Sequence, residues 1–508
     1  MEPEAQGKGR LLPAILAASA LAALLLVMAA GTGAGPGISP DSVVYIDAAR
    51  HFAAGEGPLA TDAHGDTRLV TTWPPLFPAL LGFGTLLGLE PATAALLLNA
   101  WSHAALALLV GLLAWRCSGK AGAGAVAAWL VAVAPRAVNY ASWVLTESLF
   151  LALTAGALLV LVGWLREGGW RRPAGAGLLV ALACMQRYAG YAWLAALPLW
   201  ILMQPGRAMR ERVRAAAVFV GAALPLPLLW RVVIWASQSR LDSRSGTVGL
   251  PTWLHVKSLG HSISTWLVPE TSPMPLRAAV ALLAAGAMLT GAVYVVRRRA
   301  DPSMAPGLLL LIVGGCYALL VAVTVVFLDR ALQPEPRIVL PMLPLALVAL
   351  AWTHSALRGR MRWAGFALVV LLGVGSLARS VWLVTELRDG LGYSSPEYRD
   401  SPTLKAALEQ PGPLYASNPQ PLILRGVPAR ALPLDGTIEY LMPLGVSPWP
   451  DTAQARRELR EKLAEGGCVV WFNRDGRVDE LKAELDLVTL AAYDDGELLV
   501  GRQAQARK

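Results

Sequence analysis

LLPAILAASALAALLLVMAA, residues 11–30, is an apolar run long enough to cross a lipid bilayer as an α-helix. Similar runs of about 15 to 24 residues recur as far as about residue 385. Of the 508 residues, 55% are hydrophobic and 16% are charged, and the mean hydropathy is +0.49. A soluble protein would have about a quarter of its residues charged. The sequence therefore predicts a polytopic α-helical membrane protein, and we interpret the first run as an uncleaved transmembrane helix.

Basic residues between the apolar runs predict the topology, because cytoplasmic loops hold an excess of Lys and Arg. The clusters are Lys8/Arg10, Arg116/Lys120, Arg166/Arg171/Arg172, Arg207/Arg210/Arg212/Arg214, Arg297/Arg298/Arg299 and Arg358/Arg360/Arg362. If all of them face the cytoplasm, successive clusters are separated by an even number of crossings. Residues 76–89 then form a helix at the outer interface, and Arg187 lies at the outer turn between two short crossings. The net charge of +9 records this orientation and does not indicate a nucleic-acid partner.

These rules predict about eleven transmembrane helices, with the amino terminus in the cytoplasm and the carboxyl terminus outside. They lie near residues 11–31, 91–114, 121–137, 147–165, 174–186, 189–203, 213–236, 278–296, 305–328, 338–357 and 363–385. We therefore expect a transmembrane domain at 1–385, whose first outer loop is 32–90, and an extracytoplasmic domain at 386–508. In the latter, 413–417, 467–473 and 487–501 are typical of strands, and 451–466 and 477–485 of helices. This alternation predicts a small α/β domain.

The predicted outer face collects several ionisable residues, which are costly near a membrane unless they are paired or functional. Ser39 or Asp41 can cap the helix that begins near Ser42 in the first outer loop, and Asp41 is either that N-cap or a catalytic carboxylate. Glu147 is either catalytic or an acid favoured by the helix dipole in the first turn of a helix. The long loop 237–277 is expected on the same side.

Arginines on this face suit a phosphate, because the guanidinium fork can donate two hydrogen bonds to it. Arg187 separates two apolar half-spans, where a merely structural arginine is expensive. Arg337 opens a helix, where a cation is unfavourable without an anionic partner, and Arg330 is a further donor. An outer carboxylate with these arginines indicates chemistry on a membrane lipid.

Five motifs, in this order, resemble those of the GT-C fold membrane glycosyltransferases. They are D-S-x-x-Y at 41–45, W-P-P-L-F-P-A-L-L at 73–81, T-E-S-L-F at 146–150, Q-R-Y-x-G at 186–190 and P-R-I-V-L-P-M-L-P at 336–344. The most similar group is glycosyltransferase family 39, with the protein mannosyltransferases and the bacterial lipid A aminoarabinose transferase. The resemblance covers roughly residues 10 to 385.

The resemblance implies an inverting transfer of a sugar from a polyprenyl-phosphate donor to a glycan, lipid or protein acceptor, on the outer side of the cytoplasmic membrane. Asp41 matches the family's general base, while Arg187 and Arg337 would stabilise the leaving phosphate. Many members have Asp-Glu at the first motif, where this chain has Asp41-Ser42. We therefore expect Glu147 to supply the second acid, and no cofactor is predicted with certainty, although a divalent metal stays open.

Other residues of these motifs are expected to support the site, namely Tyr45, Trp73, Pro75 and Tyr188. Trp73 also fits an interfacial aromatic belt, and Pro75 would fix the loop where it returns to the membrane. The outer histidines lack metal-ligand spacing. A transporter or flippase of a lipid-linked saccharide and a membrane scaffold with an outer binding domain are the alternative functions, although no related halves argue for a transporter.

Overall fold

The computed structural model describes residues 4–237, 240–241, 248–328, 332–434, 452–473 and 477–502. The chain divides into two compact units. Unit 1 comprises Met1–Thr32, Leu96–Val233 and Ser245–Glu386, and unit 2 comprises Gly33–Ala95, Ile234–Arg244 and Leu387–Lys508. Unit 2 thus combines the first outer loop with the carboxy-terminal part of the chain.

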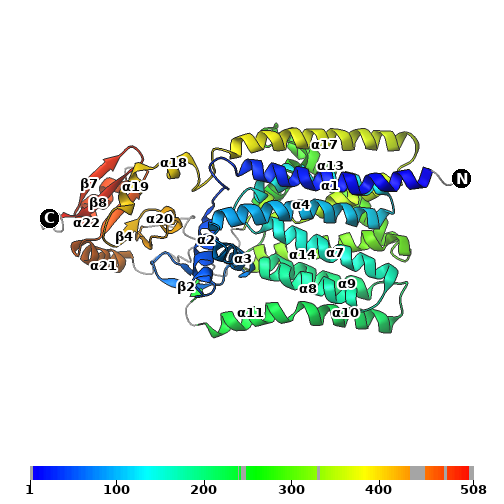
Figure 1. Cartoon of the computed structure of the whole chain (residues 1–508), viewed down its shortest axis with the longest axis horizontal. Helices are drawn as coiled ribbons and strands as arrows, with labels where there is room; N and C mark the ends of the chain where they lie inside the picture. Colours follow the sequence, from blue (N-terminus) through cyan, green and yellow to red (C-terminus); the bar gives the residue numbers. More distant parts are fainter. Residues whose placement is uncertain are drawn as a thin grey trace. The chain divides into compact units, whose positions relative to one another are not determined.

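Unit 1 is a helical bundle whose helices follow the apolar runs of the sequence (Figure 1). They are α1 (Glu4–Ala30), α4 (Pro91–Ser118), α5 (Ala121–Ala132), α6 (Pro135–Ala141), α7 (Glu147–Glu167), α8 (Arg171–Gln186), α9 (Tyr191–Leu202), α10 (Met209–Ala223), α11 (Pro225–Ala236), α12 (Trp253–Leu267), α13 (Met274–Arg297), α14 (Ala305–Phe327), α15 (Pro336–Val339), α16 (Met342–Ala356) and α17 (Gly359–Leu387). Short 3-10 turns, η1 (Tyr188–Gly190) and η2 (Pro302–Met304), precede α9 and α14.

Six of the described helices are long and apolar enough to cross a membrane, and two bent pairs raise this number to eight. The pair α5–α6 is bent by 52° and the pair α10–α11 by 40°. The ranges 121–137 and 213–236, each expected as one helix, are therefore each divided into two helices by a bend. Pro135 and Pro225 begin the second helix of each pair, because proline cannot continue a helix from the preceding turn. The protein is a multi-pass membrane protein, and the total of eleven crossings stays a prediction.

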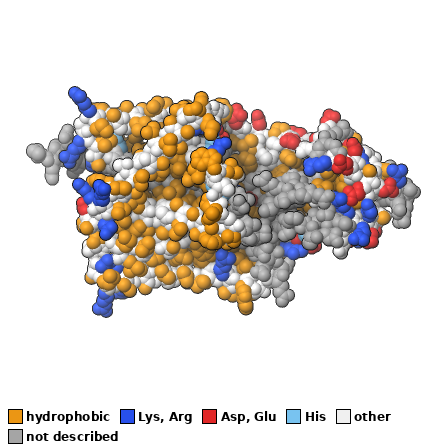
Figure 2. Space-filling model, turned by 180° about the vertical axis from the view of Figure 1, so that it is seen from behind, with side chains coloured by type: hydrophobic (Ala, Val, Ile, Leu, Met, Phe, Trp, Pro, Cys, Tyr) orange, Lys and Arg blue, Asp and Glu red, His pale blue; other side chains and the backbone are white. Residues whose placement is uncertain are grey.

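The outer surface of unit 1 is that of a lipid-facing bundle. Figure 2 shows hydrophobic side chains over the helical part, with Lys and Arg gathered at one of its ends. On α13, Leu282, Leu283 and Leu289 are each at least two thirds exposed. A protein surrounded by water would bury so many apolar side chains. Their exposure on α13 therefore indicates contact with lipid.

The segment 237–277 is only partly a loop, because α12 lies inside it. Thr252 is the N-cap of α12 and takes part in a capping box with His255. The prediction of a loop was wrong for this part, since the capping signal at Thr252 was overlooked. Residues 238–239 and 242–247 of the same segment lie outside the described residues.

Unit 2 contains the first outer loop and an α/β domain. Its elements are α2 (Pro40–Ala53), β1 (Leu59–Thr61), β2 (Thr67–Val70), α3 (Leu76–Leu86), β3 (Arg240–Leu241), α18 (Pro396–Arg399), α19 (Pro402–Leu408), β4 (Leu414–Ala416), α20 (Gln420–Leu424), β5 (Ala429–Ala431), α21 (Thr452–Ala464), β6 (Cys468–Phe472), α22 (Arg477–Leu485), β7 (Leu487–Tyr493) and β8 (Gly496–Gly501). The strands and helices expected in the carboxy-terminal domain are confirmed. Residues 76–89 form the short helix α3, as expected, and it packs on α2.

The larger sheet of unit 2 has the strand order β5-β4-β6-β8-β7. Strand β4 is parallel to β5 and β6, whereas β8 is antiparallel to β6 and β7. Alternate residues of β6 face opposite sides: Val470 joins a core with Leu404 of α19, and Val469 joins one with Leu459 of α21. Helices therefore cover both faces, which makes this part a three-layer α/β structure.

The first outer loop is held to the carboxy-terminal part by long-range contacts within unit 2. Arg50 of α2 donates to the carbonyl oxygens of Leu424 at 2.7 Å and Ile423 at 3.3 Å, where α20 ends. The amide of Ala431 donates to the carbonyl oxygen of Ala63 at 2.7 Å. A guanidinium at the end of a helix satisfies carbonyl groups that lack intrahelical partners.

Candidate functional site

A buried carboxylate with two arginines lies at the start of α7. The Glu147 side chain is 3% exposed, and its Oε1 forms ion pairs with Arg187 and Arg337, which are 18% and 23% exposed. We call these three residues the Glu147 cluster. A carboxylate buried to this degree needs such partners, because removing an unpaired charge from water costs several kcal/mol.

The break between α8 and α9 brings Arg187 to this position. Arg187 ends α8 in an extended conformation with φ −152° and ψ 140°. Its Nη1 also donates to Thr146 Oγ1 at 2.9 Å, and the buried Gln186 donates from Nε2 to the Thr146 carbonyl oxygen at 3.1 Å. Gln186 and Arg187 interrupt the apolar stretch in the sequence. Both donate hydrogen bonds to Thr146, the residue that precedes Glu147.

Arg337 is held by the short helix α15, which has Pro336 at its first position. The Tyr317 hydroxyl of α14 donates to the Ile338 carbonyl oxygen, and the Ser262 hydroxyl of α12 donates to the Pro334 carbonyl oxygen at 2.7 Å. Two helices thus fix the backbone on both sides of Arg337. The anionic partner expected for this arginine is Glu147.

Aromatic rings support the cluster from within the bundle. Trp193 of α9 lies 5.4 Å from Phe150 and 5.6 Å from Tyr317, measured between ring centroids. Since Phe150 belongs to α7 and Tyr317 contacts α15, these rings connect the helices that position Glu147 and Arg337. Edge and tilted ring contacts of this kind add to the energy of apolar burial.

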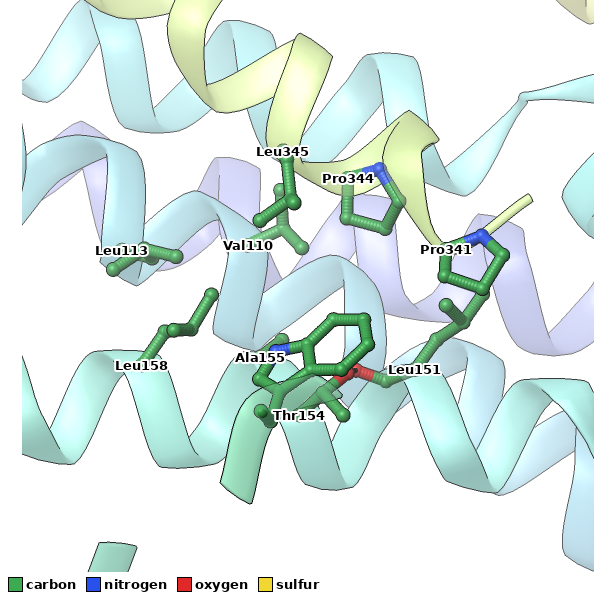
Figure 3. A pocket seen from close by; sticks show the side chains of 10 residues that line it. Val110, Leu113, Leu151, Thr154, Ala155, Leu158, Pro341, Pro344 and Leu345 are labelled. Atoms are coloured by element: carbon green, nitrogen blue, oxygen red, sulfur yellow. Dashed lines mark hydrogen bonds between the residues drawn. The ribbon is translucent and has the colours of Figure 1, made fainter. Parts of the chain in front are cut away.

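A small apolar pocket lies beside α7, and none of the three residues of the Glu147 cluster lines it. It is lined by Val110, Leu113, Leu151, Thr154, Ala155, Leu158, Trp193, Pro341, Pro344 and Leu345. Figure 3 shows Pro341, Pro344 and Leu345 on one side and Leu151, Ala155 and Leu158 on the other. Leu151 and Leu158 lie on the same face of α7 as Glu147, because residues three or four apart are neighbours on a helix. The charged cluster and the apolar pocket therefore both border α7.

The electrostatics of the cluster favour an anion. Two guanidinium groups face one carboxylate, so the cluster has one positive charge in excess. Arg187 uses Nη1 for both of its contacts, so its Nε and Nη2 are not committed to them. Guanidinium donors directed at a phosphate give strong, charge-assisted hydrogen bonds.

Asp41 lies in unit 2, in the first turn of α2. The N-cap of α2 is Ser39, which forms a capping box with Ser42, so the alternative of Asp41 as the N-cap was wrong. The helix begins at Pro40, whose fixed φ suits the first turn. Asp41 is half-buried in the first turn of α2, where the helix dipole favours an acid.

The neighbours of Asp41 on α2 are structural. Asp47 is buried and its Oδ2 accepts the Thr61 amide at 2.7 Å, which ties α2 to β1. Tyr45 is fully buried, with Trp73 and Phe77 at 5.5 and 5.3 Å between ring centroids. Packing on Tyr45 adds a third role for Trp73, beside a membrane belt and sugar binding.

The remaining candidates have separate positions. Pro75 immediately precedes α3. Tyr188 stacks on Tyr191 at 6.2 Å, accepts a hydrogen bond from Trp230 at 3.1 Å, and has the Arg231 guanidinium 5.3 Å above its ring. Arg330 lies outside the described residues.

A metal does not fit the Glu147 cluster, whose carboxylate oxygen Oε1 is occupied by two arginines. Nor do the residues that the structure describes include any group of three or more His, Cys, Asp or Glu side chains able to hold a metal ion. We therefore base no catalytic step on a metal.

Sequence reasoning missed several residues near the cluster, among them Arg136, Glu270, Arg277 and Arg379. They come from four segments, and their contacts are described below. Arg136 did offer a signal, because Pro135-Arg136 interrupts an apolar stretch. That charge was overlooked when 121–137 was interpreted as one helix.

Comparisons with known proteins find the fold among solved structures. No family model and no curated protein matches the sequence. The crystal structure of ArnT from Cupriavidus metallidurans in the apo state matches with a TM-score of 0.56 and 16% identity, covering 99% of both chains. The same protein bound to undecaprenyl phosphate matches with a TM-score of 0.58 and 15% identity, over 96% of this chain and 97% of that one. The arabinofuranosyltransferase AftD from Mycobacteria matches with a TM-score of 0.54 and 18% identity, over 96% of this chain and 40% of that one.

These matches define the class of fold. ArnT and AftD are glycosyltransferases with the GT-C fold, and the match to ArnT extends over both units of this chain. The protein therefore has the GT-C fold, with a small carboxy-terminal α/β region, which confirms the fold expected from the five motifs.

Proposed function

We propose that the protein is a membrane glycosyltransferase that moves a sugar from a polyprenyl-phosphate donor to an acceptor. Transfer takes place on the outer side of the cytoplasmic membrane, with the amino terminus in the cytoplasm and the carboxy-terminal domain outside. The observation that carries the proposal is the Glu147 cluster, a buried carboxylate with two arginines beside an apolar pocket in a GT-C fold.

Arg187 and Arg337 bind the phosphate of the donor, with Arg330 as a further donor of hydrogen bonds. Charge grows on this phosphate as its bond to the sugar breaks, and fixed guanidinium groups stabilise that charge without having to reorient. Glu147 holds both guanidinium groups in place through its ion pairs. Its catalytic contribution is then to orient the two arginines.

The apolar pocket supports a lipid-linked donor. It lies on the face of α7 that also presents Glu147, and most of its lining is aliphatic or aromatic. A polyprenyl phosphate likewise has an anionic head group followed by an apolar chain. We place the chain of the donor along this apolar face of α7, because apolar groups gain about 25 cal/mol for each Å² removed from water.

Asp41 is the general base. The acceptor hydroxyl attacks the anomeric carbon, its proton passes to the Asp41 carboxylate, and the bond between the anomeric carbon and the phosphate oxygen breaks from the opposite face. The configuration of the sugar is therefore inverted. A positioned base contributes about a hundredfold to ten-thousandfold in rate. The resemblance of the first motif, D-S-x-x-Y at 41–45, supports this role.

The experiment uses purified protein in lipid with labelled polyprenyl-phosphate sugars and a membrane extract as the source of acceptor. Donor consumption is compared between the wild type and Asp41→Asn. We expect consumption by the wild type and a loss of at least a hundredfold in Asp41→Asn, with undecaprenyl phosphate binding unchanged. Equal consumption by both proteins would refute Asp41 as the base. Movement of labelled lipid across the bilayer without donor consumption would favour a flippase.

A further inference from the structure

A second cluster of charged residues lies in unit 1, and the proposed mechanism does not use it. It consists of Arg136 of α6, His261 of α12, Glu270 of the segment between α12 and α13, Arg277 of α13 and Arg379 of α17. We call it the Arg136 cluster. Five elements contribute to it, and those at Arg136, at 261–277 and at Arg379 are far apart in the sequence.

Hydrogen bonds to Thr265 of α12 bring two of the arginines together. Arg136 donates from Nε to Thr265 Oγ1 at 3.1 Å, and Arg379 donates from Nη2 to the Thr265 carbonyl oxygen at 2.8 Å. Arg136 also forms an ion pair with Glu270. Arg379 interacts electrostatically with both Arg136 and Glu270.

The third arginine is connected through His261. Arg277 donates from Nη1 to His261 Nδ1 at 2.8 Å, and His261 Nε2 lies 3.5 Å from Glu270 Oε1. Because Arg277 is the donor in the first contact, the ring proton is assigned to Nε2, which faces Glu270. Glu270 is therefore shared by Arg136 and His261.

The charges of this cluster do not balance. Three guanidinium groups face one carboxylate, so with a neutral histidine two positive charges are in excess. In addition, Arg277 Nε is buried without a hydrogen-bond partner in the part of the chain that the structure describes. Like charges held close together repel, and a buried donor without an acceptor is costly. Both features are relieved by an anion with several oxygen atoms.

The cluster is accessible and adjoins the donor site. Glu270 is 51% exposed and His261 is 35% exposed, so a ligand can reach it. Helix α12 packs against α15, which carries Arg337. Tyr140 of α6 interacts electrostatically with Arg136 and also with Glu147, Arg337 and Glu335. A group bound at the Arg136 cluster would therefore lie next to the donor phosphate.

We infer that Arg136, Arg277 and Arg379 form a second phosphate-binding site, which takes a phosphate group of the acceptor. Naming the ligand as the acceptor rests on the proposed function, because a transferase binds its second substrate beside its donor. The donor itself supplies one phosphate, which the Glu147 cluster accounts for. The acceptor is thus a phosphorylated glycolipid or saccharide and not a neutral one.

The test measures phosphate binding by the full chain in nanodiscs of phosphatidylcholine, with the donor site first saturated by undecaprenyl phosphate. The first probe is dioleoyl phosphatidic acid, a phosphate monoester on a lipid, and the second is glucose 6-phosphate, a soluble one. The variants are Arg136→Gln and Arg277→Gln. Arg297→Gln is the matched control, because it removes the same charge at the opposite end of α13.

We expect the wild type to bind one further phosphatidic acid, and each of the two variants to bind it on the order of tenfold more weakly. Competition by glucose 6-phosphate would assign the site to soluble phosphosaccharides, and its absence would assign the site to a lipid-borne phosphate. Equal affinity in the wild type and both variants, or an equal loss in Arg297→Gln, would overturn the inference. Undecaprenyl phosphate binding that does not depend on Arg337 would instead overturn the proposed donor site.

Discussion

Replacing Arg337 with glutamine tests the donor site directly. The change removes one of the two guanidinium groups that pair with Glu147, so the excess positive charge of the cluster disappears. Glu147 keeps its ion pair with Arg187, and therefore we expect the variant to fold. A hydrogen bond between charged groups contributes about 1.5–3 kcal/mol, so undecaprenyl phosphate should bind roughly ten- to a hundredfold more weakly.

The assay is a titration of undecaprenyl phosphate against the full chain in phosphatidylcholine nanodiscs. Arg337→Lys should recover part of the affinity, because it restores the charge without the guanidinium fork. Arg297→Gln should bind like the wild type, since it removes an arginine at the end of α13. If Arg337→Gln retains wild-type affinity, the phosphate binds elsewhere and the Glu147 cluster is only structural.

Two further substitutions separate structural roles from chemical ones. Glu147→Gln should keep phosphate binding, because the cluster gains positive charge. It should lower kcat, and it should also lower the thermal unfolding midpoint, because breaking a buried ion pair costs up to about 3–5 kcal/mol. An unchanged unfolding midpoint would contradict the structural part of this reasoning. Asp47→Ala should destabilise unit 2 by about 1–3 kcal/mol, because the Thr61 amide loses its acceptor. Limited proteolysis of the full chain would measure this effect, and cleavage at the wild-type rate would refute it.

Local signals account for most of the helices and strands. Long apolar runs locate the helices of unit 1, and short runs of apolar residues locate β4, β6 and β8, whose residues are all buried. The bends before α6 and α11 were missed although Pro135 and Pro225 mark them. Proline inside an apolar run can be tolerated in a membrane helix, so its presence alone does not decide where a helix divides.

The site could be predicted residue by residue but not as a set of contacts. Glu147, Arg187 and Arg337 stood out because ionisable groups are expensive at membrane depth. Their common ion-pair network depends on how α7, α8 and α15 pack, which spacing in one sequence does not reveal. The Arg136 cluster was missed for the same reason, since Arg379 looks like a single charge near the end of a long apolar helix.

Unit 2 is built from segments that the ribosome makes at different times. Arg50 and its carbonyl partner on Leu424 are separated by 374 positions in the chain. At about 5–20 residues per second, the ribosome produces Leu424 roughly 20 to 75 seconds after Arg50. Helix α2, which carries Asp41, therefore waits outside the finished fold while the membrane helices are inserted. The contact that holds α2, the helix of the proposed base, to α20 can therefore form only after residue 424 has been made.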